Sequence, residues 1–262
     1  MNILVCVKQV PDTNEVKIDE EKGTLIRDGV PSIINPEDKN ALEEAVKLKE
    51  ENGGKVTVIS MGPPQAKTAL LEAYAMGADE CILLSDRAFA GSDTWATSYT
   101  LAQAIKHAGE FDLIFCGRQA IDGDTAQVGP QIAEKLEIPQ ITYVKELEIE
   151  GEKVKAKRAL EDGYSVIETK LPVLLTVIDD LNKPRYPSIS RIVSAFQKED
   201  CIKVWTVEDF EVDKTKLGLD ASPTQVYDTF VPTNEKKGEM LEGNEKEKVK
   251  KLLEKLKMEQ VI

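Results

Sequence analysis

The sequence predicts a doubly wound α/β fold with a mostly parallel central sheet, on the strength of three observations. Short, continuous apolar runs recur up to about residue 140, which is typical of parallel strands buried on both faces. Amphipathic stretches of helical length lie between these runs. Glycine and proline separate each run from the stretch that follows it, which indicates regular strand–helix alternation.

Four strands and four helices are expected in this region, in alternating order. The strands are expected at Ile3–Val7, Lys55–Met61, Cys81–Leu84 and Asp112–Cys116. The helices are expected at Pro36–Asn52, Pro64–Met76, Thr94–His107 and Gln127–Leu136. Asn35-Pro36-Glu37-Asp38 opens the first helix, because proline suits the first helical position and acids favour the first turn. Ser92-Asp93-Thr94 is expected to cap the third helix in a similar way.

After about residue 140 the pattern changes to an alternation of period two. Thr142–Glu150 and Lys153–Leu160 indicate a β-hairpin that turns at Gly151-Glu152. Tyr164–Lys170 and Val173–Val177 add two strands, which we expect to extend the sheet in mixed or antiparallel fashion. The next segment, Leu181–Ile192, carries two prolines and is expected to be an exposed loop.

The C-terminal part of the chain predicts a separate arm. Residues 206–242 are polar and aperiodic, and an amphipathic helix is expected at Asn244–Met258. This helix could pack on its own domain, or the segment could embrace a second subunit. The long non-periodic spacer favours the second interpretation. We therefore expect an α/β domain at residues 1–190 and a C-terminal arm at residues 191–262.

Composition disfavours several classes of function. The formal net charge of −13 makes a nucleic-acid partner unexpected. No stretch approaches the roughly 20 apolar residues of a membrane span, and the N-terminal apolar run is too short for a secretion signal, so we expect a cytoplasmic protein. Cys6, Cys81, Cys116 and Cys201 have no metal-binding spacing and are expected to be reduced and mostly buried. With His107 as the one histidine, neither a metal site nor a catalytic triad is expected.

Five loops are expected at the edge formed by the carboxyl ends of the strands, where open parallel sheets bind ligands. They span residues 8–13, 35–38, 60–63, 89–94 and 117–127. Helix N-termini after Gly62, Gly91 and Gly123 offer N–H groups to a phosphate. Neither a dinucleotide fingerprint nor a P-loop motif occurs. The edge indicates a nucleotide site built from several loops, whereas the alternative is that its glycines and prolines are ordinary loop residues.

Three charged residues of these loops have two interpretations each. Lys8 could face a phosphate or a flavin, or it could be a strand-end lysine in solvent. Asp122 and Asp124 could be paired carboxylates for acid–base chemistry. The preferred interpretation is that an aspartate of this Asp-Gly-Asp sequence caps the next helix while Gly123 turns the chain.

Four stretches resemble the beta subunit of electron-transferring flavoproteins, and the resemblance covers essentially the whole chain. They are "VCVKQVPDT" (Val5–Thr13), "NPEDKNALEEAVKLKE" (Asn35–Glu50), "GRQAIDGDTAQVGPQIAEKL" (Gly117–Leu136) and "KRALEDGYSVIETKLPVLLTVIDDLNKPRYPS" (Lys157–Ser188). The last two are long and specific. The family signature prefers Glu or Gln where this chain has Ser165, which is a small departure.

The resemblance implies a heterodimer with a larger alpha subunit that carries one FAD. In the respiratory branch of the family the beta subunit holds a structural AMP. In the flavin-bifurcating branch it holds a second, redox-active FAD, which accepts a hydride from NADH. Electrons then pass to a ferredoxin or flavodoxin and, through the alpha-subunit FAD, to an acyl-CoA dehydrogenase-type partner. "KQVPDT" (Lys8–Thr13) and "DGDTAQVGP" (Asp122–Pro130) resemble the bifurcating branch. The small residues of the second stretch would leave room for a diphosphate.

The same resemblance assigns residues to the site, and none of them is a catalytic acid or base, since the cofactor supplies the chemistry. The cofactor-binding residues implied are Cys6, Lys8, Asn35, Asp38, Met61, Gly91, Ser92, Asp93, Thr94, Thr97, Gly117, Arg118, Gln119, Ala120, Asp122, Gly123, Asp124, Thr125, Ala126, Gln127 and Val128. NADH is implied near Gln9, Val10, Pro11, Asp12 and Thr13. Leu181 resembles the hydrophobic anchor of a partner-recognition loop at residues 178–190.

Two other classes of protein remain as alternatives. A stand-alone adenine-nucleotide-binding module would form a homo-oligomer without an alpha partner, and the C-terminal arm argues against it. An ATP pyrophosphatase-type enzyme would carry a Ser-Gly-Gly-x-Asp-Ser loop after the first strand, and this sequence lacks that loop.

Overall fold

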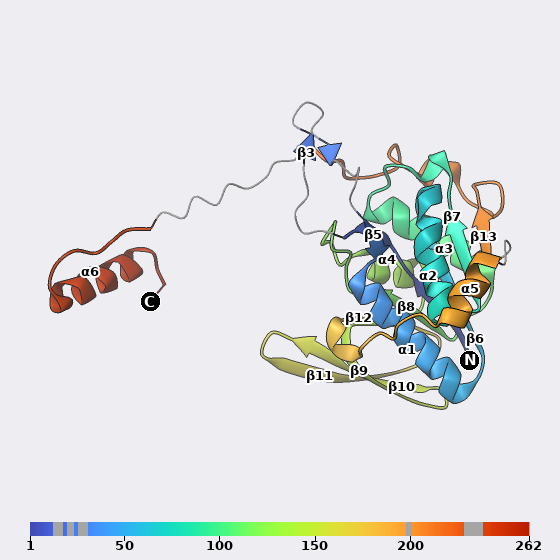
Figure 1. The fold of residues 1–262 in the computed structure, drawn as a ribbon, viewed down its shortest axis with the longest axis horizontal. Helices are drawn as coiled ribbons and strands as arrows, with labels where there is room; N and C mark the ends of the chain where they lie inside the picture. The colour runs from blue at the N-terminus through green and yellow to red at the C-terminus, as the bar shows by residue number, and fades with distance from the viewer. Residues whose placement is uncertain (13–17, 20–23, 26–30, 198–200, 228–237, 262) are drawn as a thin grey trace. The chain divides into compact units, whose positions relative to one another are not determined.

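The structure of the protein is a computed structural model that describes residues 1–12, 18–19, 24–25, 31–197, 201–227 and 238–261 (Figure 1). By their internal contacts these residues fall into two compact units. The first comprises Met1–Lys17 and Leu25–Tyr227, and the second comprises Ile18–Thr24 and Asp228–Ile262. The expected division into an α/β domain at residues 1–190 and a C-terminal arm at residues 191–262 stays a prediction. The arm was defined by its contact with a second subunit, and the structure contains this chain alone.

A nine-stranded sheet forms the centre of the first unit, in the order β11-β10-β9-β12-β8-β1-β6-β7-β13. Its strands are β1 (Asn2–Cys6), β6 (Lys55–Met61), β7 (Glu80–Leu84), β8 (Leu113–Gly117), β9 (Gln140–Glu150), β10 (Lys153–Leu160), β11 (Gly163–Lys170), β12 (Val173–Val177) and β13 (Ile202–Trp205). Two short ladders lie outside it, formed by β2 (Gln9–Pro11) with β5 (Ser32–Ile34) and by β3 (Ile18–Asp19) with β4 (Thr24–Leu25).

The sheet is parallel in its middle and antiparallel at one end, as the sequence predicts. Strand β1 pairs in parallel with both β6 and β8, and β6 pairs in parallel with β7. Strands β9, β10 and β11 form an antiparallel meander that turns at the expected Gly151-Glu152. Strand β12 lies between β8 and β9 and is parallel to both, so this part of the sheet is mixed.

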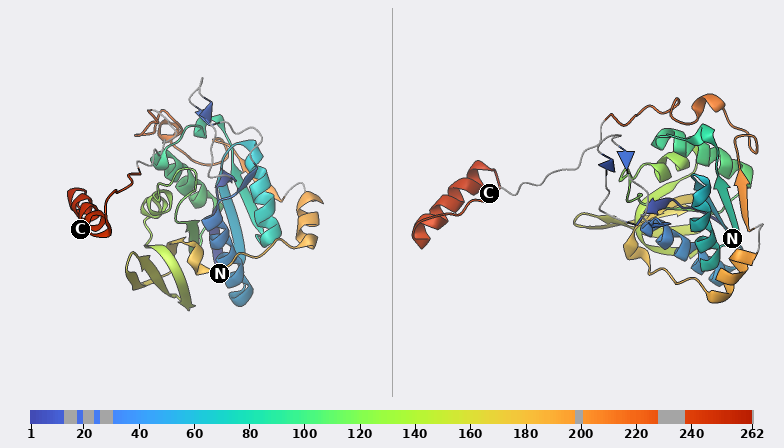
Figure 2. Two further views of the ribbon diagram at one scale, coloured as in Figure 1. Left: turned by 60° about the vertical axis from the view of Figure 1, so that its left-hand side comes forward. Right: turned by 45° about the horizontal axis from the view of Figure 1, so that its top comes forward.

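Helices cover both faces of the sheet (Figure 2). The α-helices described in the first unit are α1 (Pro36–Asn52), α2 (Lys67–Met76), α3 (Thr94–Ala108), α4 (Val128–Leu136) and α5 (Ile189–Gln197), and the second unit contains α6 (Glu245–Met258). Short 3-10 turns are η1 (Pro64–Ala66), η2 (Arg87–Phe89), η3 (Asp179–Leu181) and η4 (Lys214–Lys216). Apolar residues of α1 and α2 belong to one core cluster, whereas those of α3 and α4 belong to another. The doubly wound fold class is therefore confirmed.

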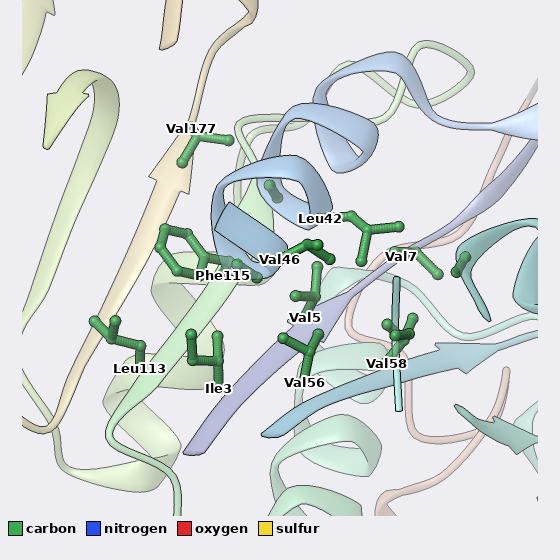
Figure 3. Packing of buried hydrophobic residues seen from close by; sticks show 14 of the residues in the cluster. Ile3, Val5, Val7, Leu42, Val46, Val56, Val58, Leu113, Phe115 and Val177 are labelled. Atoms are coloured by element: carbon green, nitrogen blue, oxygen red, sulfur yellow. The ribbon is translucent and has the colours of Figure 1, made fainter. Parts of the chain in front are cut away.

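Side chains of the parallel strands alternate between these two cores. Ile3 and Val5 of β1 join the cluster under α1, where they lie near Leu42 and Val46 (Figure 3). Leu4, between them in the sequence, joins the cluster under α3 and α4. Because successive strand residues point to opposite faces, a strand buried on both faces needs an unbroken apolar run.

Two elements after residue 180 correct the sequence analysis. The expected loop at Leu181–Ile192 ends early, because helix α5 begins at Ile189. Arg191 secures α5 to α2 by donating hydrogen bonds to the carbonyl oxygens of Tyr74 and Ala78. Strand β13 was not expected at all. It has four residues, and its pairing with β7 is a tertiary contact that such a short sequence pattern does not reveal.

The expected C-terminal helix is confirmed as α6, in the second unit. Asn244 caps it, because the Asn244 side chain accepts a hydrogen bond from the Glu247 N–H and the Glu247 carboxylate accepts one from the Asn244 N–H. No helix among the described residues is both long and apolar enough to cross a membrane.

Candidate functional site

The winding of the chain places one crevice at the carboxyl ends of β1 and β8. These strands are neighbours, yet β1 leads to α1 on one face and β8 leads to α4 on the other. In doubly wound sheets, ligands bind outside the carboxyl ends of the strands at such a switch point. The loops that leave it span residues 7–12 and 118–127, and both were expected to contribute to the site.

The start of α1 fastens the main chain of the loop after β8. The Asn35 side chain donates to the carbonyl oxygen of Gln119 (2.8 Å) and accepts from the N–H of Ile121 (3.0 Å). The Glu37 carboxylate accepts from the Gln119 N–H (3.0 Å) and forms an ion pair with Arg118 (2.9 Å). Burial raises the pKa of Glu37, and these bonds oppose that shift. Asn35 and Glu37 therefore act as supports of the loop.

Asp38 joins the two loops of the crevice. One of its carboxylate oxygens accepts a hydrogen bond from the Lys8 N–H (2.8 Å), and the other accepts one from the Gly117 N–H (2.9 Å). Burial raises the pKa of this carboxyl to about 7, although the hydrogen bonds favour the charged form. The expected contacts of Asn35 and Asp38 with a nucleotide stay predictions, since the structure shows their polar atoms engaged with the main chain.

Glycine is required at two places where elements approach closely. A Cβ at Gly117 would lie 2.3 Å from an Asp38 carboxylate oxygen and 2.9 Å from the Glu37 carbonyl carbon. A Cβ at Gly129 would lie 2.6 Å from the Thr176 side chain, so this glycine lets α4 pack on β12. Gly123 is different, because a Cβ there would meet nothing within 4 Å. The tip of the loop is open space, whereas its base is tightly packed.

Lys8 pairs with the tip of this loop. Its Nζ lies 2.6 Å from an Asp122 carboxylate oxygen, and both side chains are partly exposed. The ion pair bridges the loops that follow β1 and β8, so Lys8 is neither buried nor free in solvent. Its contact with a phosphate or a flavin stays a prediction.

The expectation that an aspartate of the Asp-Gly-Asp sequence caps α4 is wrong. Gln127 occupies the N-cap position of α4 without a side-chain cap hydrogen bond. Asp122 is held by Lys8, and Asp124 accepts a hydrogen bond from the Gln119 side chain (2.7 Å). The physical reason is distance along the chain, because three residues follow Asp124 before α4 begins. The first N–H groups of α4 are therefore left without a side-chain partner.

The segment before α4 has an unusual main-chain conformation. Asp124 and Ala126 have φ values of 47° and 52°, a left-handed region that residues other than glycine rarely adopt. Ala126 is followed by Gln127 in the right-handed region, with φ −109° and ψ −31°. Alternation of left- and right-handed residues turns successive N–H groups toward one side and forms a concavity that suits an anion. Strained residues of this kind cluster at ligand sites.

The start of α3 is arranged differently. Asp93 caps it, as expected, by accepting from the N–H groups of Trp95 and Ala96 (both 3.0 Å). Gly91 is packed against Leu219, and the Ser92 hydroxyl donates to the Phe89 carbonyl oxygen. Gly91, Ser92 and Asp93 therefore serve the packing of this loop in the structure, and their contact with a cofactor stays a prediction.

Hydroxyl and amide groups connect the starts of α3 and α4. The Thr94 hydroxyl donates to the Gln127 side chain (2.9 Å), and the Gln131 side chain donates to Thr94 (3.4 Å). Thr97 lies one turn further along α3, half-buried. The expected residues Thr94 and Gln127 are thus brought together beside the uncapped start of α4, whereas a contact of Thr97 with a cofactor stays a prediction.

The remaining expected residues lie on several elements around the crevice. Cys6 is buried at the end of β1, and Met61 is half-buried at the end of β6. Ala120, Thr125, Ala126 and Val128 belong to the loop after β8 or to the first turn of α4, and Thr125 is exposed.

The segment expected near NADH is partly described. Gln9, Val10 and Pro11 form β2, and the Gln9 side chain donates to the Thr68 hydroxyl (2.7 Å). Asp12 is exposed, and Thr13 lies outside the described residues. Leu181, the expected docking anchor, ends η3 and is partly buried against the core under α1.

Glu37 is a site residue that the sequence analysis missed. It lies in the expected loop at residues 35–38, but the only role given to its side chain was a favourable charge in the first turn of α1. The signal that could have identified it is its place beside Asn35 and Asp38 at an edge predicted to bind a ligand.

The fold defines a doubly wound α/β protein with a crevice at the switch point of its sheet. The chain matches the family described as "Electron transfer flavoprotein domain" over residues 22–209, which is more than half of its length. It therefore belongs to the electron transfer flavoprotein family, and relatives named as beta subunits that match it over their full length identify it as a beta subunit. Beta subunits of this family work with an alpha subunit, and the family binds a flavin or AMP.

Relatives with similar sequences extend over the full chain. It is 63% identical over 262 residues to the electron transfer flavoprotein subunit beta of Thermoanaerobacterium thermosaccharolyticum, covering 100% of each chain. It is 54% identical to the Acetobacterium woodii protein named caffeyl-CoA reductase-Etf complex subunit CarD, and 48% identical to the acryloyl-CoA reductase electron transfer subunit gamma of Anaerotignum propionicum. Both alignments cover 100% of each chain.

Proposed function

We propose that this chain is the beta subunit of a flavin-bifurcating electron transfer flavoprotein. In this proposal it binds a second FAD, which accepts a hydride from NADH when bound. Electrons leave toward a ferredoxin or flavodoxin and, through the FAD of the alpha subunit, toward an acyl-CoA dehydrogenase-type enzyme in the cytoplasm. The names of two relatives, which refer to caffeyl-CoA reductase and acryloyl-CoA reductase, support a partner of this kind.

The observation that carries the proposal is the open segment between Asp122 and α4, whose main chain suits an anion. The start of α4 lacks a side-chain cap, Asp124 and Ala126 are left-handed, and no atom would meet a Cβ at Gly123 within 4 Å. Free N–H groups at a helix start favour a phosphate group. A segment with small side chains and open space accommodates a diphosphate, and so fits FAD as well as AMP.

Residues of this chain would hold both the adenosine end and the flavin end of such a cofactor. The loop at residues 117–121, fixed by Asn35 and Glu37, would hold the adenosine part. The main chain at residues 124–128, with Thr94 and Thr97, would hold the diphosphate. Lys8 lies on the far side of the crevice and reaches Asp122, so its ammonium could also face a flavin ring or phosphate bound between the two loops. NADH would approach residues 9–13.

The second candidate is a respiratory-type beta subunit with structural AMP. The same crevice and the same helix start would bind the AMP phosphate. It differs in what would lie beside the open segment at Gly123, which would then face solvent instead of a diphosphate. The openness of that tip favours the bifurcating proposal.

Cofactor content of the heterodimer, produced with its alpha subunit, tests the proposal. We expect one FAD in each subunit and no AMP. Thr125→Glu should remove the FAD of this subunit and leave that of the alpha subunit, because a carboxylate beside the diphosphate repels it. Flavin absorbance and nucleotide chromatography of the denatured complex measure both. One FAD with tightly bound AMP in the unmodified heterodimer would reject the bifurcating assignment in favour of the respiratory type.

Residues 178–190 are proposed to dock onto the dehydrogenase through Leu181. Leu181→Ala should raise the KM for the dehydrogenase about tenfold, which corresponds to ~1.4 kcal/mol, because it truncates an apolar anchor. Flavin content should not change. Steady-state transfer from the heterodimer to a purified acyl-CoA dehydrogenase measures this. An unchanged KM would remove Leu181 from the interface.

The C-terminal arm is proposed to embrace the alpha subunit. Helix α6 supports this, because Val249, Leu252 and Leu253 form an apolar stripe whose members are each about half exposed or more. An amphipathic helix is stabilised when another protein buries its apolar stripe.

A further inference from the structure

An ion-pair cluster holds the segment 178–190 against α1. The Arg185 guanidinium binds Glu43 through Nε (2.9 Å) and Nη2 (3.0 Å). It also binds Glu50 through Nη1 (2.6 Å) and Nη2 (3.0 Å). The main-chain N–H of Arg185 donates to Glu43 as well (3.0 Å). One side chain and its own N–H thus fix this part of the segment to two carboxylates of one helix.

A second contact holds the segment closer to Leu181. The Asn40 side chain donates to the Asn182 carbonyl oxygen (2.8 Å), and the Asn182 side chain donates to the Asn40 carbonyl oxygen (3.0 Å) and to Glu44 (3.0 Å). Asn40 and Glu44 are 5% and 3% exposed, so water does not compete for these bonds. Leu181 lies next to Asn182 in the chain and is itself packed on the core under α1.

The contacts come from one face of α1. Asn40, Glu43 and Glu44 are three and four residues apart, and Glu50 lies two turns beyond Glu43, so their side chains are neighbours on the helix surface. Helix α1 packs on the sheet through apolar residues such as Ala41, Leu42 and Val46. The four polar side chains are not needed for that packing. A buried carboxylate lowers stability unless it is paired. Glu43 and Glu44 are therefore matched to the segment 178–190, which supplies their partners.

Helix α1 therefore supports two loops at once. Its first turn holds the loop after β8 through Asn35, Glu37 and Asp38. Its next turns hold residues 182–185. An α-helix is stiff over this length and rises about 1.5 Å per residue, so the distance between the two loops is fixed.

We propose that Arg185 and Asn182 are positioning residues, which hold Leu181 in its docking conformation and at a fixed distance from the cofactor loop through α1. The inference rests on the proposed docking function of residues 178–190. A loop already ordered in its bound conformation loses less entropy on docking, so the clamp lowers the KM for the dehydrogenase without taking part in electron transfer.

The test uses the complete heterodimer and five variants of this chain, one of which is the Leu181→Ala variant described above. Arg185→Gln removes the fork, Arg185→Lys keeps the charge but cannot bind two carboxylates in the same way, and Glu50→Gln removes only the more exposed partner, whose side chain is 54% exposed. Lys106→Gln is the control, because Lys106 is exposed near the end of α3 and has no ion pair or hydrogen bond in the part of the chain that the structure describes. Hydrogen exchange of residues 179–188, cofactor content, and KM and kcat for a purified acyl-CoA dehydrogenase are measured for each.

For Arg185→Gln we expect exchange at the Arg185 amide to rise about tenfold or more, since its hydrogen bond to Glu43 opens more often. The KM should rise about five- to tenfold with kcat and cofactor content unchanged. The rise in KM should be smaller for Arg185→Lys and for Glu50→Gln than for Arg185→Gln. The KM of Lys106→Gln should equal that of the unmodified protein.

Each other result has a defined meaning. If Arg185→Gln leaves exchange and KM unchanged while Leu181→Ala raises the KM, the positioning role is overturned and the docking proposal stands. If neither variant changes the KM although exchange rises, the docking function of the segment is rejected and the inference with it. A parallel loss of cofactor and kcat would assign Arg185 a general structural role and overturn the inference.

Discussion

Gly117→Ala is expected to destabilise the protein by about 2–3 kcal/mol and to disrupt the crevice, because overpacking a rigid site forces its neighbours apart. The added methyl group would lie 2.3 Å from an Asp38 carboxylate oxygen and 2.9 Å from the Asp38 main-chain nitrogen. Neither can yield without breaking the bonds between Asp38 and the two loops. Urea unfolding measures the loss of stability, and cofactor content measures the loss of the crevice.

Gly123→Ala is the matched control for this change. It adds the same methyl group to the loop that follows β8, where it would meet nothing within 4 Å, and Gly123 is not among the glycines with positive φ. Its free energy of unfolding should stay within about 0.5 kcal/mol of the unmodified protein. Equal free energies of unfolding for the two variants would show that α1 is not packed as closely against Gly117 as in the structure.

Asp38→Asn is expected to cost about 1–3 kcal/mol at about pH 5, because one of the two N–H groups now bonded to the carboxyl oxygens would face an amide N–H₂ group instead of an oxygen. The N–H groups belong to Lys8 and Gly117, so both loops of the crevice would loosen together. Cofactor content of the heterodimer should fall with stability. Full retention of cofactor in a destabilised variant would limit Asp38 to a role in folding.

The same variant predicts a pH dependence with a defined sign. Burial raises the pKa of Asp38 from 3.8 to about 7, so between these values the folded protein holds a proton that the unfolded chain has released. The stability that Asp38 contributes is therefore complete below about pH 4 and is lost as the pH rises through 7. The difference in free energy of unfolding between the unmodified protein and Asp38→Asn should fall by at most ~1.4 kcal/mol per pH unit. A difference that grows with pH would show that the hydrogen bonds outweigh burial and keep the carboxyl ionised.

Much of the fold could be predicted from the sequence because its parallel strands are buried on both faces. Runs such as Lys55–Met61 and Val173–Val177 leave few other structures possible, and capping residues such as Asp93 and Asn244 mark helix starts locally. Strand β13 and helix α5 were missed because they depend on contacts with β7 and α2, which lie more than a hundred residues earlier.

The sequence predicted where the site residues lie better than it predicted what their side chains bind. The topology placed Lys8, Asn35, Asp38 and the loop after β8 at one edge, and the structure brings them together. The pattern could not reveal that Asn35 and Asp38 bind main-chain groups, since a polar side chain near a ligand edge has the same sequence signal in either role. The prediction that an aspartate of the Asp-Gly-Asp sequence caps α4 was also wrong. Asp124 and Ala126 adopt left-handed conformations that the sequence does not reveal, and α4 begins only after three further residues.

The apolar stripe of α6 has a consequence for the life of the protein in a cell. If the alpha subunit covers this stripe, a copy of the chain made in excess leaves Val249, Leu252 and Leu253 open to chaperones and proteases. Unassembled copies would then be degraded faster than assembled ones. The arm would in this way keep the amounts of the two subunits equal, a task separate from electron transfer.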